Sequence, residues 1–342
     1  MSQANDHAQQ WAHAGIPEAK HAAVARALHE AFGANELEDI RAQTGRLTAM
    51  LVFRIVVHGT PYLLRLIPEQ SFGTPDREFA CMRLASQADV APTIRYASVD
   101  DRLLISDFVD VKPYPADPAP DIARVIRRVH ALPGFPMAIK YFDVIDGFIR
   151  RFLAAKHLPE SATDELFRLY AEVANVYPRE DDLVASHNDL KPQNILFDGA
   201  RFWLVDWEAA FLSDRFTDLA VAANFFVFDD REEAAYLEAY FGEPATPIQR
   251  ARFFLMRQVV SVFYGTCFMP LGARTVKPAE VDEALPGWQS FHRGLTVNQI
   301  DVADDRVKIQ YARLHFNRAL ANMRSPRFEE SLALIAAAQP RP

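Results

Sequence analysis

Hydrophobic and polar positions alternate in the first third of the chain and predict antiparallel strands. Residues 47–57 alternate and are rich in branched side chains, residues 58–61 (His-Gly-Thr-Pro) form a turn signal, and residues 62–67 are apolar again. This pattern indicates a hairpin. Two more strands are expected on either side of Asp100 and Asp101, so we predict a small antiparallel sheet.

Outside the predicted strands, much of the chain carries apolar residues at helical spacing. The predicted helices cover residues 18–32, 75–87, 121–132, 142–155, 162–176, 247–268, 302–323 and 327–338. Residues 270–291 interrupt this pattern and are predicted to form a loop that carries Trp288.

Four prolines between residues 113 and 120 mark the best boundary in the chain, because proline disfavours both helix interiors and central strands. We therefore expect a first domain at residues 1–110 and a second, mostly helical domain at residues 111–342, with the junction near residues 109–111.

Composition excludes several classes of protein. The 342 residues are 50% hydrophobic, which allows a sizeable core, and the net charge of -8 argues against a nucleic-acid partner. No run of 18 apolar residues or signal-peptide pattern is evident, so neither a membrane partner nor secretion is expected. Cys81 and Cys267 are expected to be free thiols in a cytoplasmic protein, and the oligomeric state is left open.

The densest chemical signal lies in residues 186–207. A polar loop, HNDLKPQN, precedes two short apolar runs that are joined by Asp198 and Gly199, which predicts a β-hairpin. The hairpin would hold Asp189 and Asn194 at its entry and Asp206 at its exit. Oxygen ligands of this kind suit Mg²⁺, which leaves its other positions to water and substrate phosphates.

The loop resembles the H-x-D-x-x-x-x-N catalytic loop of kinases. The variants HND and VDW, with an upstream LLRL and a downstream TDLA, look like the aminoglycoside phosphotransferase and choline/ethanolamine kinase superfamily. The resemblance spans residues 47–226. It implies an α+β, bilobal protein-kinase-like fold with a small antiparallel β-sheet N-lobe and a larger, mostly helical C-lobe. It also implies a small-molecule kinase that uses ATP and Mg²⁺ to phosphorylate a hydroxyl acceptor.

The resemblance also assigns roles to residues. Asp189 would orient the acceptor hydroxyl and take its proton, and Lys191 would neutralise charge on the transferring phosphate. Asn194 and Asp206 would hold Mg²⁺. By the same resemblance, Asp218 caps a helix and bonds the catalytic loop backbone, and His187 and His130 are structural.

The nucleotide-binding residues are implied in the same way: Arg65, Glu78, Thr48, Asp107 and Val109. Arg65 would contact phosphate oxygens and pair with Glu78, whereas adenine would meet the backbone of residues 107–109. An exposed strand arginine is the alternative for Arg65, and Asp76 competes with Glu78 as its partner.

The acceptor is the least defined part of the prediction. The acid and the tryptophans with which choline kinases bind their acceptor have no clear counterpart here, so Trp207, Glu208, Tyr264 and Trp288 are candidates for acceptor contacts. Two other functions stay open. One is a non-catalytic nucleotide-binding module on the same fold, and the other is a protein kinase, although D-F-G and A-P-E motifs are missing.

Overall fold

The structure, a computed structural model, describes residues 11–34, 36–43, 51–69, 74–179, 182–281, 284–297 and 299–338. The chain divides into two compact units. The first comprises Met1–Tyr114 and Ile195–Ala210, and the second comprises Pro115–Asn194 and Phe211–Pro342. The predicted domain division at residue 110 stays a prediction, since the compact units differ from it by grouping a late hairpin with the N-terminal part of the chain.

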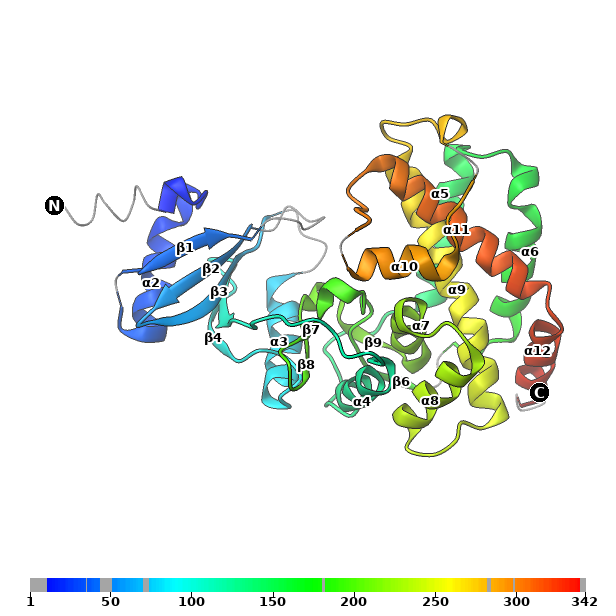
Figure 1. The fold of residues 1–342 in the computed structure, drawn as a ribbon, viewed down its shortest axis with the longest axis horizontal. Helices are drawn as coiled ribbons and strands as arrows, with labels where there is room; N and C mark the ends of the chain where they lie inside the picture. Colours follow the sequence, from blue (N-terminus) through cyan, green and yellow to red (C-terminus); the bar gives the residue numbers. More distant parts are fainter. Residues whose placement is uncertain are drawn as a thin grey trace. The chain divides into compact units, whose positions relative to one another are not determined.

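The first unit is built on a five-stranded antiparallel sheet with the strand order β1-β2-β3-β5-β4 (Figure 1). Its strands are β1 (Asp39–Ala42), β2 (Leu51–Val57), β3 (Thr60–Leu66), β4 (Ile94–Ser98) and β5 (Leu103–Asp107). The predicted hairpin is confirmed, because β2 and β3 pair from Val57 and Thr60 outward. The turn is tighter than expected: only His58 and Gly59 connect the strands, and both have the positive φ of a two-residue hairpin turn.

Helix α2 (Glu18–Phe32) packs on one face of this sheet. It ends as predicted at Gly33, whose left-handed backbone lets its N–H donate to the His29 carbonyl. Alternate residues of β3 point to opposite faces, so Leu64 joins the core beneath α2 while Arg65 lies on the other face.

Helix α3 (Pro75–Gln87) and a second hairpin complete the first unit. This hairpin consists of β7 (Ile195–Phe197) and β8 (Phe202–Leu204), as the Asp-Gly pattern predicted, and the short η3 turn (Trp207–Ala209) follows. Backbone bonds from Leu204 N–H to the Val90 carbonyl and from Lys112 N–H to the Phe197 carbonyl attach the hairpin to the rest of the unit.

The second unit is mostly helical and contains one two-stranded antiparallel sheet, β6 (Leu183–Ser186) with β9 (Phe211–Asp214). Its helices are α4 (Ala119–His130), α5 (Tyr141–Ala155), α6 (Asp164–Val176), α7 (Arg215–Phe226), α8 (Asp230–Phe241), α9 (Pro247–Gly272), α10 (Trp288–Thr296), α11 (Asp305–Met323) and α12 (Pro326–Ala338). The expected loop at residues 270–291 is partly wrong, because Trp288 begins α10. The predicted α+β kinase-like fold class is confirmed.

Helix α9 is the centre of the second unit and packs against α5, α6, α7, α11 and α12 (Figure 1). Among the described residues it is the one helix that is long and apolar enough to cross a membrane, yet 67% of its most apolar window is buried within the protein. Such burial is what a core helix requires. Both cysteines are free, as predicted.

A glycine in α9 permits its closest helix contact. A Cβ atom at Gly265 would overlap the ring of Phe316 on α11. That ring cannot move aside easily, because it packs edge-on against Phe152 at 5.4 Å and Phe167 at 6.3 Å.

We therefore expect Gly265→Ala to lower the free energy of unfolding by about 1–3 kcal/mol through overpacking. Gly147→Ala on α5 is the control, because its Cβ meets only Arg150 at 3.8 Å and should raise helix stability by up to about 1 kcal/mol. Chemical denaturation of the two variants measures both effects. Equal stability of Gly265→Ala and the wild type would contradict the close approach.

Candidate active site

A buried carboxylate holds the backbone of the loop that follows β6. Asp218 on α7 accepts the His187 N–H at 2.8 Å through Oδ2 and the Asn188 N–H at 2.6 Å through Oδ1. Asn188 has a left-handed backbone (φ 63°), so the two successive N–H groups converge on one carboxylate. The predicted contact of Asp218 with the loop is confirmed, but its predicted capping role is wrong. The N-cap of α7 is Asp214, which accepts the Phe216 N–H.

Two histidine side chains support this arrangement, one at the Asp218 carboxylate and one at the Asp189 backbone. His130, at the end of α4, lies 3.1 Å from Asp218 Oδ2 through Nε2 and 2.7 Å from the Tyr240 hydroxyl through Nδ1. His187 is fully buried, and its Nδ1 accepts the Asp189 N–H at 3.4 Å. Both histidines therefore have the structural role that we expected.

The loop gathers three of the predicted site residues around one oxygen. Asp189 Oδ2 forms an ion pair with Lys191 Nζ and accepts a hydrogen bond from Asn194 Nδ2 at 2.9 Å. Asn194 also donates to the Asp189 carbonyl at 2.8 Å, and the short η2 turn (Pro192–Asn194) places it there. The Asp189 side chain is about one-quarter exposed (27%), so solvent reaches it.

Two side-chain oxygens of this arrangement receive no hydrogen bond from a described residue. Asp189 Oδ1 and Asn194 Oδ1 accept no hydrogen bond from the part of the chain that the structure describes. The amide of Asn194 must turn its NH₂ group toward the two acceptor oxygens of Asp189, so its carbonyl oxygen faces away and can bind a cation. Asp189 Oδ1 can accept a proton while Oδ2 stays anchored.

The first unit holds a second buried charge cluster. Arg65 Nη2 lies 2.7 Å from Glu78 Oε1 on α3 and 3.2 Å from Asp206 Oδ1. Arg65 is only 3% exposed, so the exposed-strand alternative is wrong, and the predicted pairing with Glu78 is confirmed. Asp76 is exposed. Burial alone would lower the pKa of Arg65, but the carboxylates of Glu78, Asp206 and Glu208 outweigh it and raise the pKa above its ordinary value.

Asp206 reaches Arg65 from a strained backbone position. It follows β8 with φ 71° and ψ 67°, a left-handed conformation that aspartate tolerates better than most residues. The buried Trp207 ring anchors the turn, since its Nε1–H donates to the Leu204 carbonyl at 3.2 Å. Arg77 donates to the Glu208 carbonyl at 2.6 Å. Trp207 is thus part of the core of the first unit.

Of the two residues predicted to meet adenine, Asp107 uses its backbone N–H within the described part of the protein, whereas Val109 does not. The Asp107 N–H donates to the Thr93 carbonyl at 2.9 Å, and its carboxylate pairs with Arg95 at 2.6 Å. The backbone of Val109 makes no hydrogen bond with another described residue. Thr48 lies outside the described residues, so its predicted phosphate contact stays a prediction.

The remaining acceptor candidates lie in a group that sequence reasoning only partly found. Tyr264 and Trp288 belong to what we call the histidine–aromatic cluster, together with His292, Tyr311 and His315. The i, i+4 spacing of residues 288 and 292, and of 311 and 315, was a signal that these side chains share helix faces. Nothing in the sequence showed that α9, α10 and α11 would bring them together.

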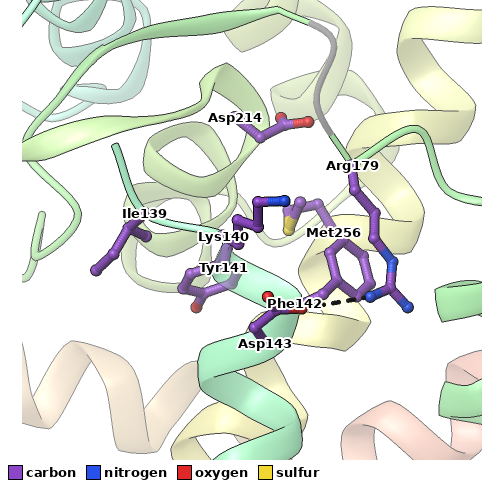
Figure 2. Close-up of a pocket in the computed structure, with 8 residues that line it drawn as sticks. All are labelled: Ile139, Lys140, Tyr141, Phe142, Asp143, Arg179, Asp214 and Met256. Atoms are coloured by element: carbon purple, nitrogen blue, oxygen red, sulfur yellow. Dashed lines mark ion pairs between the residues drawn. The ribbon is translucent and has the colours of Figure 1, made fainter. Parts of the chain in front are cut away.

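A separate cavity of about 110 Å³ lies at the start of α5. Figure 2 shows its lining, which includes Lys140, Asp214 and Met256, and the ion pair between Asp143 and Arg179 at 3.6 Å. None of the predicted site residues lines this cavity, and its wall carries charges of both signs.

Across the described ranges, no group of three or more His, Cys, Asp or Glu side chains could hold a metal ion. Asn194 belongs to the second unit and Asp206 to the first, so their predicted joint binding of Mg²⁺ stays a prediction.

Comparisons with known proteins bear on the family and on the fold. The phosphotransferase enzyme family matches residues 39–254, more than half of the chain. A search of the curated proteins finds no significant match.

Solved structures share the fold at low identity. A choline/ethanolamine kinase family protein from Mesorhizobium loti is 21% identical, with a TM-score of 0.67 over 93% of this chain and 100% of that one. A choline kinase from Streptococcus pneumoniae is 15% identical, with a TM-score of 0.59 over 88% and 98%, and it has also been solved with AMP. A spectinomycin phosphotransferase with ADP and spectinomycin is 14% identical, with a TM-score of 0.50 over 93% and 97%.

The buried Arg65 cluster yields a prediction about stability. Glu78→Gln removes the nearer of two anionic partners from a buried cation and should lower the free energy of unfolding by about 1.5–3 kcal/mol. Asp76→Asn removes an exposed charge from the same turn of α3 and should cost about 0.3–1 kcal/mol. Denaturant unfolding of both variants tests this difference, and equal losses would show that the buried ion pair is not important for stability.

Proposed function

The chain belongs to the phosphotransferase enzyme family, and from this membership we propose that it transfers the γ-phosphate of ATP to a hydroxyl of a small molecule. The proposal rests on the hydrogen bonding of the Asp189 carboxylate. One of its oxygens is anchored by Lys191 and Asn194, and the other is open toward solvent. A carboxylate held in this way can orient an alcohol and accept its proton.

The reaction balances without a covalent enzyme intermediate. A bond forms between the acceptor oxygen and the γ-phosphorus as the bridging P–O bond breaks, and ADP leaves with the electron pair. The hydroxyl proton moves to Asp189 Oδ1. Lys191 pairs with the same carboxylate and would neutralise charge on the phosphoryl group, and the Asp218 contacts keep the loop backbone in place.

We further propose that Asn194 and Asp206 hold Mg²⁺. Each residue supports the proposal within its own unit: the amide oxygen of Asn194 accepts no hydrogen bond from a described residue, and the backbone of its turn holds the buried carboxylate of Asp206 in place. Bound Mg²⁺ would neutralise phosphate charge during transfer. Arg65 keeps the Asp206 carboxylate oriented, and Glu78 keeps Arg65 in position. The open backbone of Val109 is our candidate for contact with adenine.

Two free cysteines fit a reducing compartment, so we propose that the enzyme acts in the cytoplasm.

Replacing the proposed base, Asp189, should reduce phosphoryl transfer without changing ATP binding. We expect Asp189→Asn to lower kcat roughly 10²–10⁴-fold, because the amide cannot take a proton, while calorimetry shows unchanged ATP affinity. ADP formation is measured with a panel of sugars, polyols, amino alcohols and aminoglycosides.

Asp230→Asn is the matched control for that experiment, because the Asp230 side chain is 100% exposed and should tolerate the same substitution. ATP binding without turnover, in the wild type and Asp189→Asn alike, would indicate a non-catalytic nucleotide-binding module and would overturn the proposal.

The metal assignment has its own test. EDTA should stop turnover, Mg²⁺ should restore it, and Asp206→Asn should need roughly tenfold more Mg²⁺ for half-maximal rate because it lacks a charged ligand. Asp198→Asn is the control in the same hairpin, where Asp198 only accepts bonds from the turn and from Trp203. An unchanged Mg²⁺ requirement in Asp206→Asn would remove Asp206 from the metal site.

A further inference from the structure

Tyr240 is the far end of a chain of hydrogen bonds that leads to the catalytic loop. It is buried on α8, and its hydroxyl lies 2.7 Å from Nδ1 of His130 on α4. Nε2 of the same ring lies 3.1 Å from Asp218 Oδ2 on α7, and that oxygen also accepts the His187 N–H at 2.8 Å. Three helices thus connect one buried hydroxyl with the backbone two residues before Asp189.

The packing of the helices brings the members of this chain together. Helix α4 contacts both α7 and α8 (Figure 1). Helix α8 ends at Gly242, whose backbone is left-handed (φ 83°), and a Cβ atom there would lie 2.8 Å from Nη1 of Arg127 on α4. The last turns of α4 and α8 therefore approach each other closely, and these turns carry His130 and Tyr240.

The direction of each hydrogen bond follows from the groups that form it. A carboxylate accepts and does not donate, so Nε2 of His130 must carry the proton that faces Asp218. In a neutral ring Nδ1 then has only a lone pair, and the Tyr240 hydroxyl donates to it. Burial raises the pKa of Tyr240 to about 12, so the hydroxyl keeps its proton at neutral pH and can act as this donor.

The two bonds together select one orientation of the imidazole ring. Rotation of the ring by 180° about its Cβ–Cγ bond would exchange Nδ1 with Cδ2 and Nε2 with Cε1. Carbon atoms would then face Tyr240 and Asp218, and both buried groups would lose a hydrogen bond. Ring packing alone does not prevent this rotation, because the outline of the ring hardly changes. The Tyr240 hydroxyl therefore favours the orientation in which Nε2 reaches the carboxylate.

Core packing does not require a hydroxyl at position 240. Phenylalanine would fill nearly the same space without a polar atom to desolvate. Tyr236, one turn earlier on α8, is also buried, but its hydroxyl donates to the backbone carbonyl of Leu219 at 3.1 Å. The Tyr240 hydroxyl instead bonds to a side chain that contacts the anchor of the catalytic loop.

We propose that Tyr240 is a positioning residue for phosphoryl transfer: its hydroxyl orients His130, and His130 in turn orients the Asp218 carboxylate that holds the loop. The inference rests on the proposed phosphotransfer by Asp189. A small displacement of a catalytic group lowers the rate steeply, so loss of this remote hydroxyl should lower kcat.

Kinetics of Tyr240→Phe test the proposal, because this change removes the hydroxyl and keeps the ring. With the best acceptor of the panel used for Asp189→Asn, we expect kcat to fall roughly three- to tenfold while the KM for ATP stays unchanged. Tyr236→Phe is the matched control, since it removes a buried hydroxyl from the same helix and should leave kcat within about twofold of the wild type. Wild-type kcat in Tyr240→Phe, or equal losses in the two variants, would overturn the inference.

A double-mutant cycle tests whether Tyr240 acts through His130. His130→Phe removes both ring nitrogens, so adding Tyr240→Phe should lower kcat no further. Additive losses would show that Tyr240 acts by another route and would overturn the proposal. If His130→Phe does not fold, the exchange measurement that follows decides alone.

Amide hydrogen exchange follows the same chain of bonds without relying on turnover. The His187 and Asn188 amides should exchange at least threefold faster in Tyr240→Phe than in Tyr236→Phe, because only the first change loosens the Asp218 carboxylate. Equal exchange in the two variants would overturn the positioning role and leave the phosphotransferase function intact. If the wild type turns over no acceptor, the proposed function fails and the positioning role fails with it.

Discussion

One carboxylate determines the shape of the catalytic loop. Asp218 is fully buried and accepts two successive backbone N–H groups, from His187 and Asn188. Two N–H groups of neighbouring residues converge only when one residue leaves the ordinary backbone regions, and Asn188 does so. The position of Asp189 is therefore a consequence of a contact made one and two residues earlier, together with the bond from its own N–H to His187.

The first unit also contains a buried charge with several partners, but here the charge is positive. Arg65 is buried between the sheet and α3, where an isolated cation would be costly, and Glu78 and Asp206 compensate it. In each unit a buried charge has several partners that come from distant parts of the chain. Such groups rigidify the elements that they join, because moving one partner leaves the others unsatisfied in a medium of low dielectric constant.

Much of the fold and of the catalytic loop could be predicted from residues close together in the sequence. The turn residues of both hairpins, several of which have positive φ in the structure, predicted where each hairpin lies, and the spacing within HNDLKPQN identified Asp189, Asn194 and the loop between them. The sequence did not show the hydrogen bonds of Asp218 at the level of atoms. The α10 helix was missed because residues 270–291 read as a loop, whereas packing against neighbouring helices overrides such local signals.

The histidine–aromatic cluster shows where local reasoning ends. His292 and His315 are 23 residues apart and belong to different helices, and each alone is an ordinary helical histidine. They meet only when α9, α10 and α11 pack. Burial then lowers the pKa of both rings, and it leaves Nε2 of His292 and both nitrogens of His315 without a partner among the described residues. Hydrophobic packing alone would be better served by phenylalanine, which has the same shape and no polar atoms to desolvate.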